Sequence, residues 1–265
     1  WSCVVSAELL INVTPSESRV ALIENGILQE IHVERHTKRG LVGNIYRGKV
    51  SRVLPGMQAA FVDIGLEKAA FLHASDIVIH NEIAEEVSAS HIQKQDIREL
   101  VRDGQDIVVQ VVKDPIGTKG ARLTTDITIP SRYLVFMPSV THVGVSQRIE
   151  EEAERERLKS LVQEFCDENG GFILRTAAEG VGKNELQSDA AFLRRLWDKI
   201  QSRMKKRKSN VLYEDLPLAR RVLRDFVGTE LDRIRIDSKL SFNELHHFTK
   251  EYVPEMNGKL EYYPG

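Results

Sequence analysis

The chain has 265 residues, of which 42% are apolar and 29% are charged, which is ordinary for a soluble globular protein of one to three domains. Its formal net charge of −2 excludes a globally basic nucleic-acid-binding protein, so any nucleic-acid site must be a local basic patch. No apolar run is long enough to span a membrane, and Cys3 and Cys166 are too isolated to indicate a zinc site or a disulfide framework. We therefore expect a cytoplasmic protein without membrane contact.

The first forty residues predict an antiparallel meander. Strands are expected at residues 8–13, 19–23 and 27–33, and an Asn-Gly hairpin signature precedes the third. Three strands without a helix cannot bury a core, so a later part of the chain must complete this sheet.

Residues 43–77 carry the most informative alternation. Strands are expected at residues 45–53, 58–64 and 69–73, with a Pro-Gly turn between the first two. The period of two places Arg47, Lys49 and Ser51 on one side of the first of these strands.

The second and third of these strands separate aliphatic from aromatic side chains. Ala60, Val62 and Ile64 share one face, and Ala70 and Leu72 share the matching face of the next strand. The opposite faces hold Phe61 with Asp63, and Phe71 with His73.

Each aromatic ring therefore shares its strand face with a polar residue. This arrangement suits a platform on which nucleic-acid bases stack, and each stacked base contributes roughly 1–3 kcal/mol to binding. The alternative is that these rings are ordinary core residues, because aromatics at strand spacing usually are.

The other expected elements are, in chain order, a loop at 80–95, a helical turn at 97–101, strands at 106–113, 122–127, 133–137 and 144–147, a helix at 150–169, a strand at 171–175, and helices at 185–206, 216–236 and 242–252. The helix at 185–206 ends in a basic tract at 203–208. That tract suits either contact with nucleic-acid phosphates or the ordinary preference of a helix C-terminus for cations.

Three motifs in the stretch at 43–77 resemble an RNA-binding module. GNIYRGKV, AAFVDIG and AFLHASDI are similar to the OB-fold module of the ribosomal-protein-S-one type. The resemblance implies a small five-stranded barrel with an RNA face, on which a final hairpin carries an Asp and a basic residue at Asp114 and Lys119. We expect the RNA contacts to come from Phe61, Phe71, His73, Lys119, Arg47 and Lys49.

The resemblance extends from about Ala7 to Gly265. AELLINV, GILQE and GTKGARLTT, together with the barrel, are similar to the start of the bacterial ribonuclease E/G family. This implies an α+β fold in three parts. They are an RNase H-like subdomain from residues 1–39 and 213–265, an inserted OB-fold barrel at 40–128, and a small α+β 5′-sensor subdomain at 129–212.

The motif GFILRTA at residues 171–177 looks like the sensor motif of that family. The resemblance implies that Arg175 and Thr176 hold a terminal 5′-phosphate, helped by backbone at Ser131 and Val135. A guanidinium offers paired planar donors to phosphate, and a hydroxyl adds a short donor beside them. Ser131 stands where other family members can carry a glycine.

The family cleaves RNA with magnesium held by acidic residues in a later region, and a zinc-linking Cys motif lies there too. The resemblance therefore implies no metal ligand in this chain, and we expect the chain by itself not to cleave RNA.

We interpret the chain as the RNA-binding, 5′-end-sensing region of a single-strand-specific endoribonuclease of ribosomal RNA maturation and mRNA decay, in a homo-oligomer. Its RNA partners would be ribosomal RNA precursors and mRNA with a 5′-monophosphate. The alternative is a stand-alone, non-catalytic RNA-binding protein, and continuation of the reading frame into an acidic magnesium site would separate the two.

Overall fold

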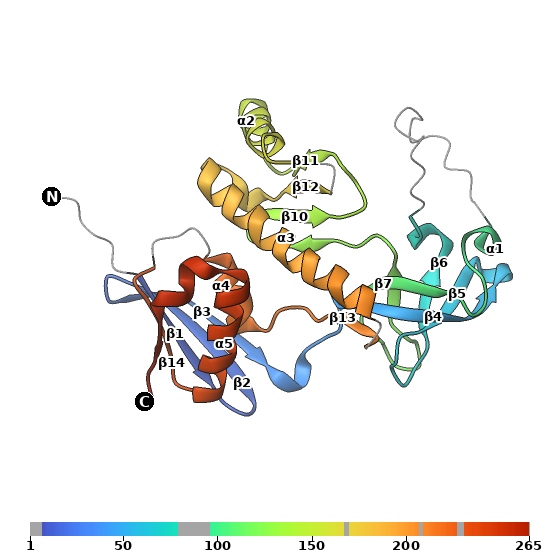
Figure 1. Ribbon diagram of the computed structural model, residues 1–265, viewed down its shortest axis with the longest axis horizontal. Coiled ribbons are helices and arrows are strands. Elements are labelled where there is room, and N and C mark those ends of the chain that lie inside the picture. Colours follow the sequence, from blue (N-terminus) through green and yellow to red (C-terminus); the bar gives the residue numbers. More distant parts are fainter. Residues whose placement is uncertain (1–6, 79–95, 167–169, 207–208, 227–230, 265) are drawn as a thin grey trace.

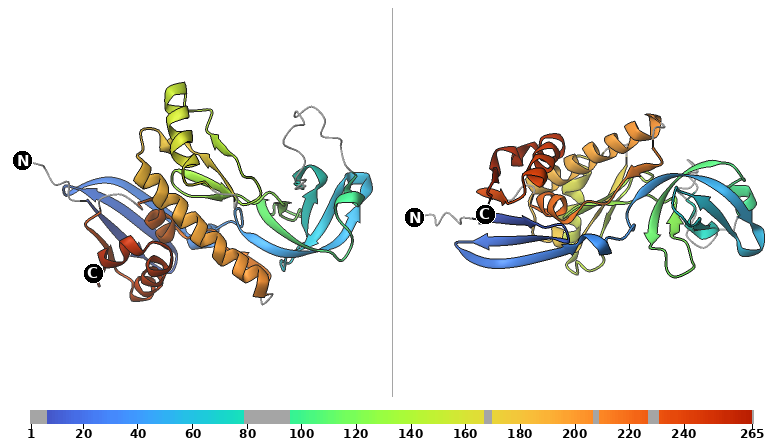
Figure 2. Two further views of the ribbon diagram at one scale, coloured as in Figure 1. Left: turned by 45° about the horizontal axis from the view of Figure 1, so that its top comes forward. Right: turned by 90° about the horizontal axis from the view of Figure 1, so that it is seen from below.

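The computed structural model describes residues 7–78, 96–166, 170–206, 209–226 and 231–264, which form three sheets with helices packed on two of them (Figure 1). The fold is mixed α+β, as expected. Figures 1 and 2 show a barrel at one end of the molecule, the N-terminal sheet at the other, and the long helix α3 between them. None of the helices in these ranges is long and apolar enough to cross a membrane.

The N-terminal sheet joins the two ends of the described chain. Its strands are β1 (Ala7–Val13), β2 (Glu17–Glu24), β3 (Ile27–Arg35), β14 (Arg233–Ile236) and β15 (Leu260–Tyr262), in the order β15-β14-β1-β2-β3. The predicted antiparallel meander is confirmed, and β14 and β15 complete it as parallel strands. Helices α4 (Leu218–Asp225) and α5 (Lys239–Tyr252) contribute to the core beneath this sheet.

The helix predicted at residues 216–236 is wrong in its second half. The helix α4 ends at Asp225, and the chain returns as strand β14 beside β1, pairing Leu9 with Ile234. The reason is tertiary: alternation buries Ile234 and Ile236 in the sheet that the meander could not complete alone.

The barrel contains β4 (Ile45–Leu54), β5 (Ala59–Asp63), β6 (Ala70–His73), β7 (Asp106–Lys113) and β8 (Arg122–Thr124). The strand order is β4-β5-β6-β8-β7, and pairing of β4 with β7 closes a five-stranded barrel. The barrel has a hydrophobic core of its own, and the short helix α1 (Ile97–Leu100) adds Ile97 to it. The loop expected at 80–95 lies outside the described residues.

One glycine is required by close packing in the barrel. A Cβ at Gly120 would lie 1.9 Å from the backbone oxygen of Ala69, so a larger residue would push β8 away from β6.

The third sheet has the order β11-β12-β10-β9, with β9 (Ile129–Pro130), β10 (Leu134–Met137), β11 (Val143–Val145) and β12 (Gly171–Leu174). Helices α2 (Glu152–Gln163) and α3 (Lys183–Lys206) pack on it. The helix expected at 150–169 is therefore shorter, although residues 167–169 lie outside the described chain. Strand β9 was not predicted because two residues carry no readable period.

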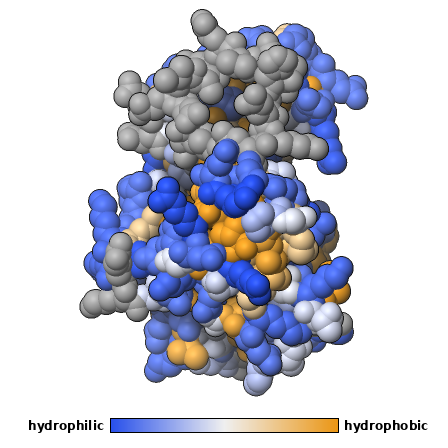
Figure 3. All heavy atoms as spheres, turned by 90° about the vertical axis from the view of Figure 1, so that its right-hand side faces the viewer, coloured by the Kyte–Doolittle hydropathy of each residue, from blue (hydrophilic) through white to orange (hydrophobic). Residues whose placement is uncertain are grey.

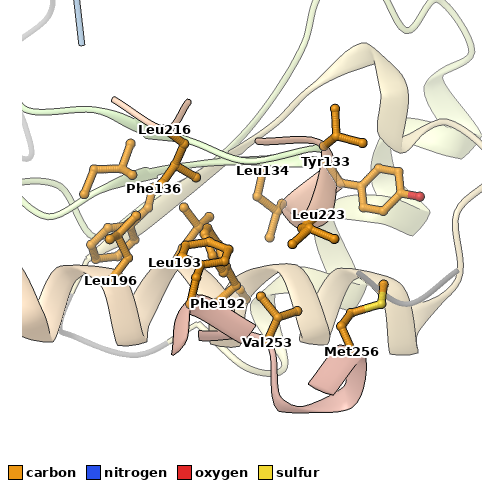
Figure 4. Packing of buried hydrophobic residues seen from close by; sticks show 14 of the residues in the cluster. Tyr133, Leu134, Phe136, Phe192, Leu193, Leu196, Leu216, Leu223, Val253 and Met256 are labelled. Carbon is orange, nitrogen blue, oxygen red and sulfur yellow. The ribbon is translucent and has the colours of Figure 1, made fainter. Parts of the chain in front are cut away.

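The helix α3 links the third sheet to the other two parts. Figure 4 shows Leu134 and Phe136 of β10 facing Leu193 and Leu196 of α3, within a core that continues to the N-terminal sheet. After α3, the unpredicted strand β13 (Val211–Tyr213) pairs with β4 of the barrel. The C-terminal end of α3 is thereby tied to the barrel while its first half lies under the third sheet.

Candidate nucleic-acid interface

Three rings lie together on the outer face of strands β5 and β6. Phe61 and Phe71 are direct cross-strand partners with ring centroids 6.2 Å apart in an edge-on arrangement. The His73 ring follows Phe71 at 6.4 Å. Their neighbours Ala60, Val62 and Leu72 are fully buried in the barrel, whereas all three rings are half-buried. The alternation predicted from the sequence is confirmed, and RNA contact by these rings stays a prediction.

The edges of the aromatic row are basic. In the strand register Arg52 of β4 faces Phe61, and Arg122 of β8 lies beside Phe71. Beyond Arg122, β7 contributes Lys113. A row of aromatic rings flanked by cations matches the two needs of single-stranded nucleic acid, which are a π surface for bases and positive charge for phosphates.

Sequence reasoning missed Arg52 and Arg122. A register shift between Val50 and Arg52 leaves both Ser51 and Arg52 exposed, so the simple period of two fails there. No local residue pattern predicts that bulge.

Arg122 is held rigidly. Its Nε and Nη2 donate to the two carboxylate oxygens of Asp76 at 2.9 and 3.1 Å, and this pairing raises the pKa of the guanidinium. Arg122 is the register partner of Phe71, where β6 and β8 pair.

The three basic residues predicted from the sequence occupy different surroundings. Lys49 of β4 is exposed and is the register partner of Asp63 of β5, on the same outer face as Phe61. Lys119 is exposed in the turn before β8, where its backbone forms a bridge with Ile116.

Arg47 already has a structural partner. Its guanidinium donates to the backbone oxygen of Met204 near the end of α3, and its backbone N–H donates to Asn210 O at 2.7 Å. Arg47 therefore ties the barrel to α3, and its predicted contact with RNA stays a prediction.

Figure 3 views the molecule from the barrel end and shows apolar side chains gathered in the middle of this face among hydrophilic ones. Such a mixed surface is what an exposed stacking face requires, because the π faces of bases are apolar and their backbone is charged.

The second candidate site lies where strand β12 ends. Arg175 and Thr176 follow the last residue of that strand and are both exposed. The Arg175 N–H donates to Tyr133 O at 2.8 Å, and its guanidinium Nη1 donates to Ser131 O. The Thr176 hydroxyl lies 3.3 Å from the hydroxyl of Ser146. A guanidinium has five N–H donors, and Ser131 O is its sole hydrogen-bond partner within the described ranges.

The predicted contributors Ser131 and Val135 lie in the turn that Arg175 contacts and in strand β10, which pairs with β12. Val135 is half-buried on β10 and pairs with Ile173 of β12. Ser131 is fully buried, and its hydroxyl lies 2.5 Å from Asp189 Oδ2 while its N–H donates to Leu134 O at 2.8 Å. Both donors of Ser131 are thus engaged, the N–H within the turn and the hydroxyl by Asp189 of α3 and by Leu134 O. The Ser131 carbonyl accepts a hydrogen bond from the Arg175 guanidinium. Direct contact of Ser131 or Val135 with phosphate stays a prediction.

Comparison with known proteins shows which families the two parts of the chain resemble. The profile of the S1 RNA binding domain matches residues 41–122, which contain the aromatic row and the barrel up to the first residue of β8. The profile of the Ribonuclease E/G family matches residues 128–265, more than half of the chain. The chain belongs to the ribonuclease E/G family.

Individual members of the family are similar over nearly the whole chain. Ribonuclease G of Escherichia coli is 67% identical over 262 residues, which cover 98% of this chain and 54% of that protein. Ribonuclease G of Haemophilus influenzae is 62% identical, covering 98% of this chain and 53% of that protein. Ribonuclease E of a Nostoc strain is 36% identical, covering 90% of this chain and 33% of that protein. The chain thus spans about half the length of its ribonuclease G relatives.

The metals implied by the family resemblance find no ligand set in the described part of this chain. No group of three or more His, Cys, Asp or Glu side chains there could hold a metal ion.

Proposed function

We propose that this chain is the RNA-binding and 5′-monophosphate-sensing region of a single-strand-specific endoribonuclease that acts in ribosomal RNA maturation and mRNA decay. The observation that carries the proposal is the presence of two separate candidate RNA sites on one chain. One is the aromatic row with basic edges on the barrel, and the other is the exposed Arg175–Thr176 pair at the end of β12. Magnesium-dependent cleavage belongs, in this proposal, to a region that follows the sites described here.

The division into subdomains is part of the proposal. Residues 1–39 and 213–265 would form the RNase H-like subdomain, which is supported by the joining of β14 and β15 to β1–β3 in one sheet. The barrel at 40–128 would be inserted between them, and residues 129–212 would form the 5′ sensor. The homo-oligomer and the cytoplasmic location implied by the family resemblance are further predictions.

The physical basis for sensing is the charge of the RNA end. A 5′-monophosphate carries about −1.5 to −2 at neutral pH, by analogy with other phosphate monoesters, whereas an internal phosphate carries a single charge. The exposed guanidinium of Arg175 can give this end two parallel donors, and the Thr176 hydroxyl lies next to it in the chain.

The test compares two RNAs that differ only in a 5′-monophosphate or a 5′-hydroxyl end, at one fixed salt concentration. Arg175→Ala removes the bidentate partner, and Thr176→Val removes a hydroxyl at nearly constant volume. A charge-assisted hydrogen bond contributes about 1.5–3 kcal/mol, so Arg175→Ala should weaken binding of the monophosphorylated RNA about 10- to 150-fold. Binding of the 5′-hydroxyl RNA should hardly change.

Arg52→Ala is the matched control, because it removes an exposed arginine at the barrel row. It should weaken binding of both RNAs equally. Equal loss on both RNAs with Arg175→Ala would instead make Arg175 an ordinary backbone contact and would defeat the sensing proposal.

The second candidate function is a stand-alone RNA-binding protein without catalysis. It predicts the same RNA binding by the barrel. It also predicts that the product of the full-length reading frame does not cleave RNA in the presence of magnesium. Magnesium-dependent cleavage of a single-stranded RNA by the full-length product, lost when the following acidic region is removed, supports the nuclease.

A further inference from the structure

A buried carboxylate lies behind the Arg175 site. Asp189 of α3 is 2% exposed, and its Oδ2 atom receives three donors from a single turn. These donors are the Ser131 hydroxyl at 2.5 Å and the backbone N–H groups of Tyr133 and Leu134, each at 3.0 Å. A carboxylate that accepts three hydrogen bonds from neighbouring residues fixes the path of the backbone that supplies them.

The same turn holds Arg175 in two places. The Tyr133 carbonyl accepts the Arg175 backbone N–H, and the Ser131 carbonyl accepts its guanidinium. One oxygen of Asp189 therefore organises the donors of residues 131–134, and the carbonyls of the same residues organise Arg175. The chain of contacts is continuous from Asp189 to the guanidinium.

Among the described residues, Asp189 forms no ion pair. Its charge is favoured by Arg224, but that side chain is committed to Asp225 at 2.6 Å and to Pro130 O at 2.9 Å. Burial raises the pKa of Asp189, whereas its bonds to the turn oppose that rise. Burying a carboxylate is costly unless it is hydrogen-bonded, and here every hydrogen bond to it that the structure gives comes from the turn beside Arg175.

We infer that Asp189 is a positioning residue for the 5′-monophosphate site, acting by holding the turn 131–134 that fixes Arg175. This inference rests on the proposed function of Arg175. Asp189 does not touch the RNA. Its own negative charge would repel a phosphate, so any benefit to phosphate binding must come from geometry.

That sign makes the inference testable. Asp189→Ala removes both the charge and the acceptor. If only the electric field mattered, binding of 5′-monophosphorylated RNA would become tighter. If positioning matters, the ratio of affinities for 5′-monophosphate and 5′-hydroxyl RNA should fall roughly tenfold, as when outer partners of other preorganised sites are lost. Affinity for the 5′-hydroxyl RNA reports whether the barrel and the overall fold persist.

Two further variants separate positioning from loss of fold. Asp189→Asn keeps an acceptor oxygen for the turn, so it should restore most of the ratio at a melting temperature close to that of the parent chain. Asp198→Ala removes an exposed carboxylate from the same helix and should leave the ratio unchanged.

The outcomes distinguish this inference from the proposed function. If Arg175→Ala lowers the ratio but a folded Asp189→Ala does not, Asp189 is a structural residue only and the inference fails. If Arg175→Ala leaves the ratio unchanged, the proposed sensing site fails first. If Asp189→Ala unfolds, the ratio measured with Ser131→Ala decides, because that variant removes one of the three donors and keeps both backbone bonds; an unchanged ratio there refutes the inference.

Discussion

Phe71 and Leu72 are chain neighbours on opposite faces of β6, so replacing each one separates RNA binding from barrel stability. Phe71 is the middle ring of the outer row, with Phe61 at 6.2 Å and His73 at 6.4 Å. Leu72 is fully buried in the barrel core. Phe71→Ala should weaken binding of a single-stranded 5′-hydroxyl RNA by about 1–3 kcal/mol, the contribution of one stacked base.

The expected cost in stability is moderate for both variants. Phe71→Ala loses about 1 kcal/mol from burial of the half-buried ring and about 0.5–1.5 kcal/mol from its edge-on contact with Phe61, so it should lower the free energy of unfolding by about 2 kcal/mol. Leu72→Val removes one buried methylene and should cost about 1 kcal/mol. Both losses are smaller than the ~5–15 kcal/mol stability of a typical protein, so both variants should stay folded and only the first should lose RNA affinity.

The assay is RNA binding at one salt concentration, with urea unfolding of the same samples. Affinity should fall about 5- to 150-fold in Phe71→Ala, which is the stacking energy expressed as a ratio, and less than about twofold in Leu72→Val. If Phe71→Ala is instead strongly destabilised, with RNA binding that only tracks the folded fraction, the ring is a core residue and the outer platform does not exist.

The remaining predictions concern charge. Arg52→Ala should reduce the slope of log affinity against log salt by about 0.7, the value for one phosphate contact on a single strand. Arg47→Ala should lower thermal stability, because Arg47 is bonded to the end of α3, and a fall of that slope by the same amount would support its predicted contact with RNA. Glu154 accepts two bonds from Arg157, at 2.6 and 2.7 Å, which lower the pKa of Glu154 from 4.5 to about 2. A lowered folded-state pKa stabilises the fold above pH 4.5, and this stabilisation is lost as the pH falls toward 2. The free energy of unfolding of Glu154→Gln, measured with urea, should accordingly depend less on pH between pH 2 and 4.5 than that of the parent chain. The same pH dependence in both would mean that the Glu154–Arg157 pair does not persist in solution.

The sequence by itself determined the strands at 43–77 and which side chains share each of their faces. A period of two is set by the pleat of each strand, so the separation of Phe61 and Phe71 from Ala60 and Leu72 could be predicted before any strand was paired. Closure into a barrel and a sensing role for Arg175 and Thr176 were implied only by resemblance to a family, and the sensing role stays a prediction.

The tertiary structure decided what depends on pairing between distant segments. Arg52 faces Phe61 only because a bulge shifts β4 against β5, and Arg233–Ile236 is a strand only because β1 offers a parallel partner more than two hundred residues away along the chain. Local propensity does not include either contact.

Asp189 shows the same limit at the candidate sensing site. In the sequence it is one acidic residue near the start of an amphipathic helix, beside the apolar positions Leu186 and Leu193. Its role depends on the contact between α3 and the turn 131–134, which lies more than fifty residues before Asp189 in the sequence. Hydrogen bonds that close such long loops form only when the core under β10 and α3 brings the two segments together, so side-chain periodicity predicts the helix but not the atoms that its carboxylate meets.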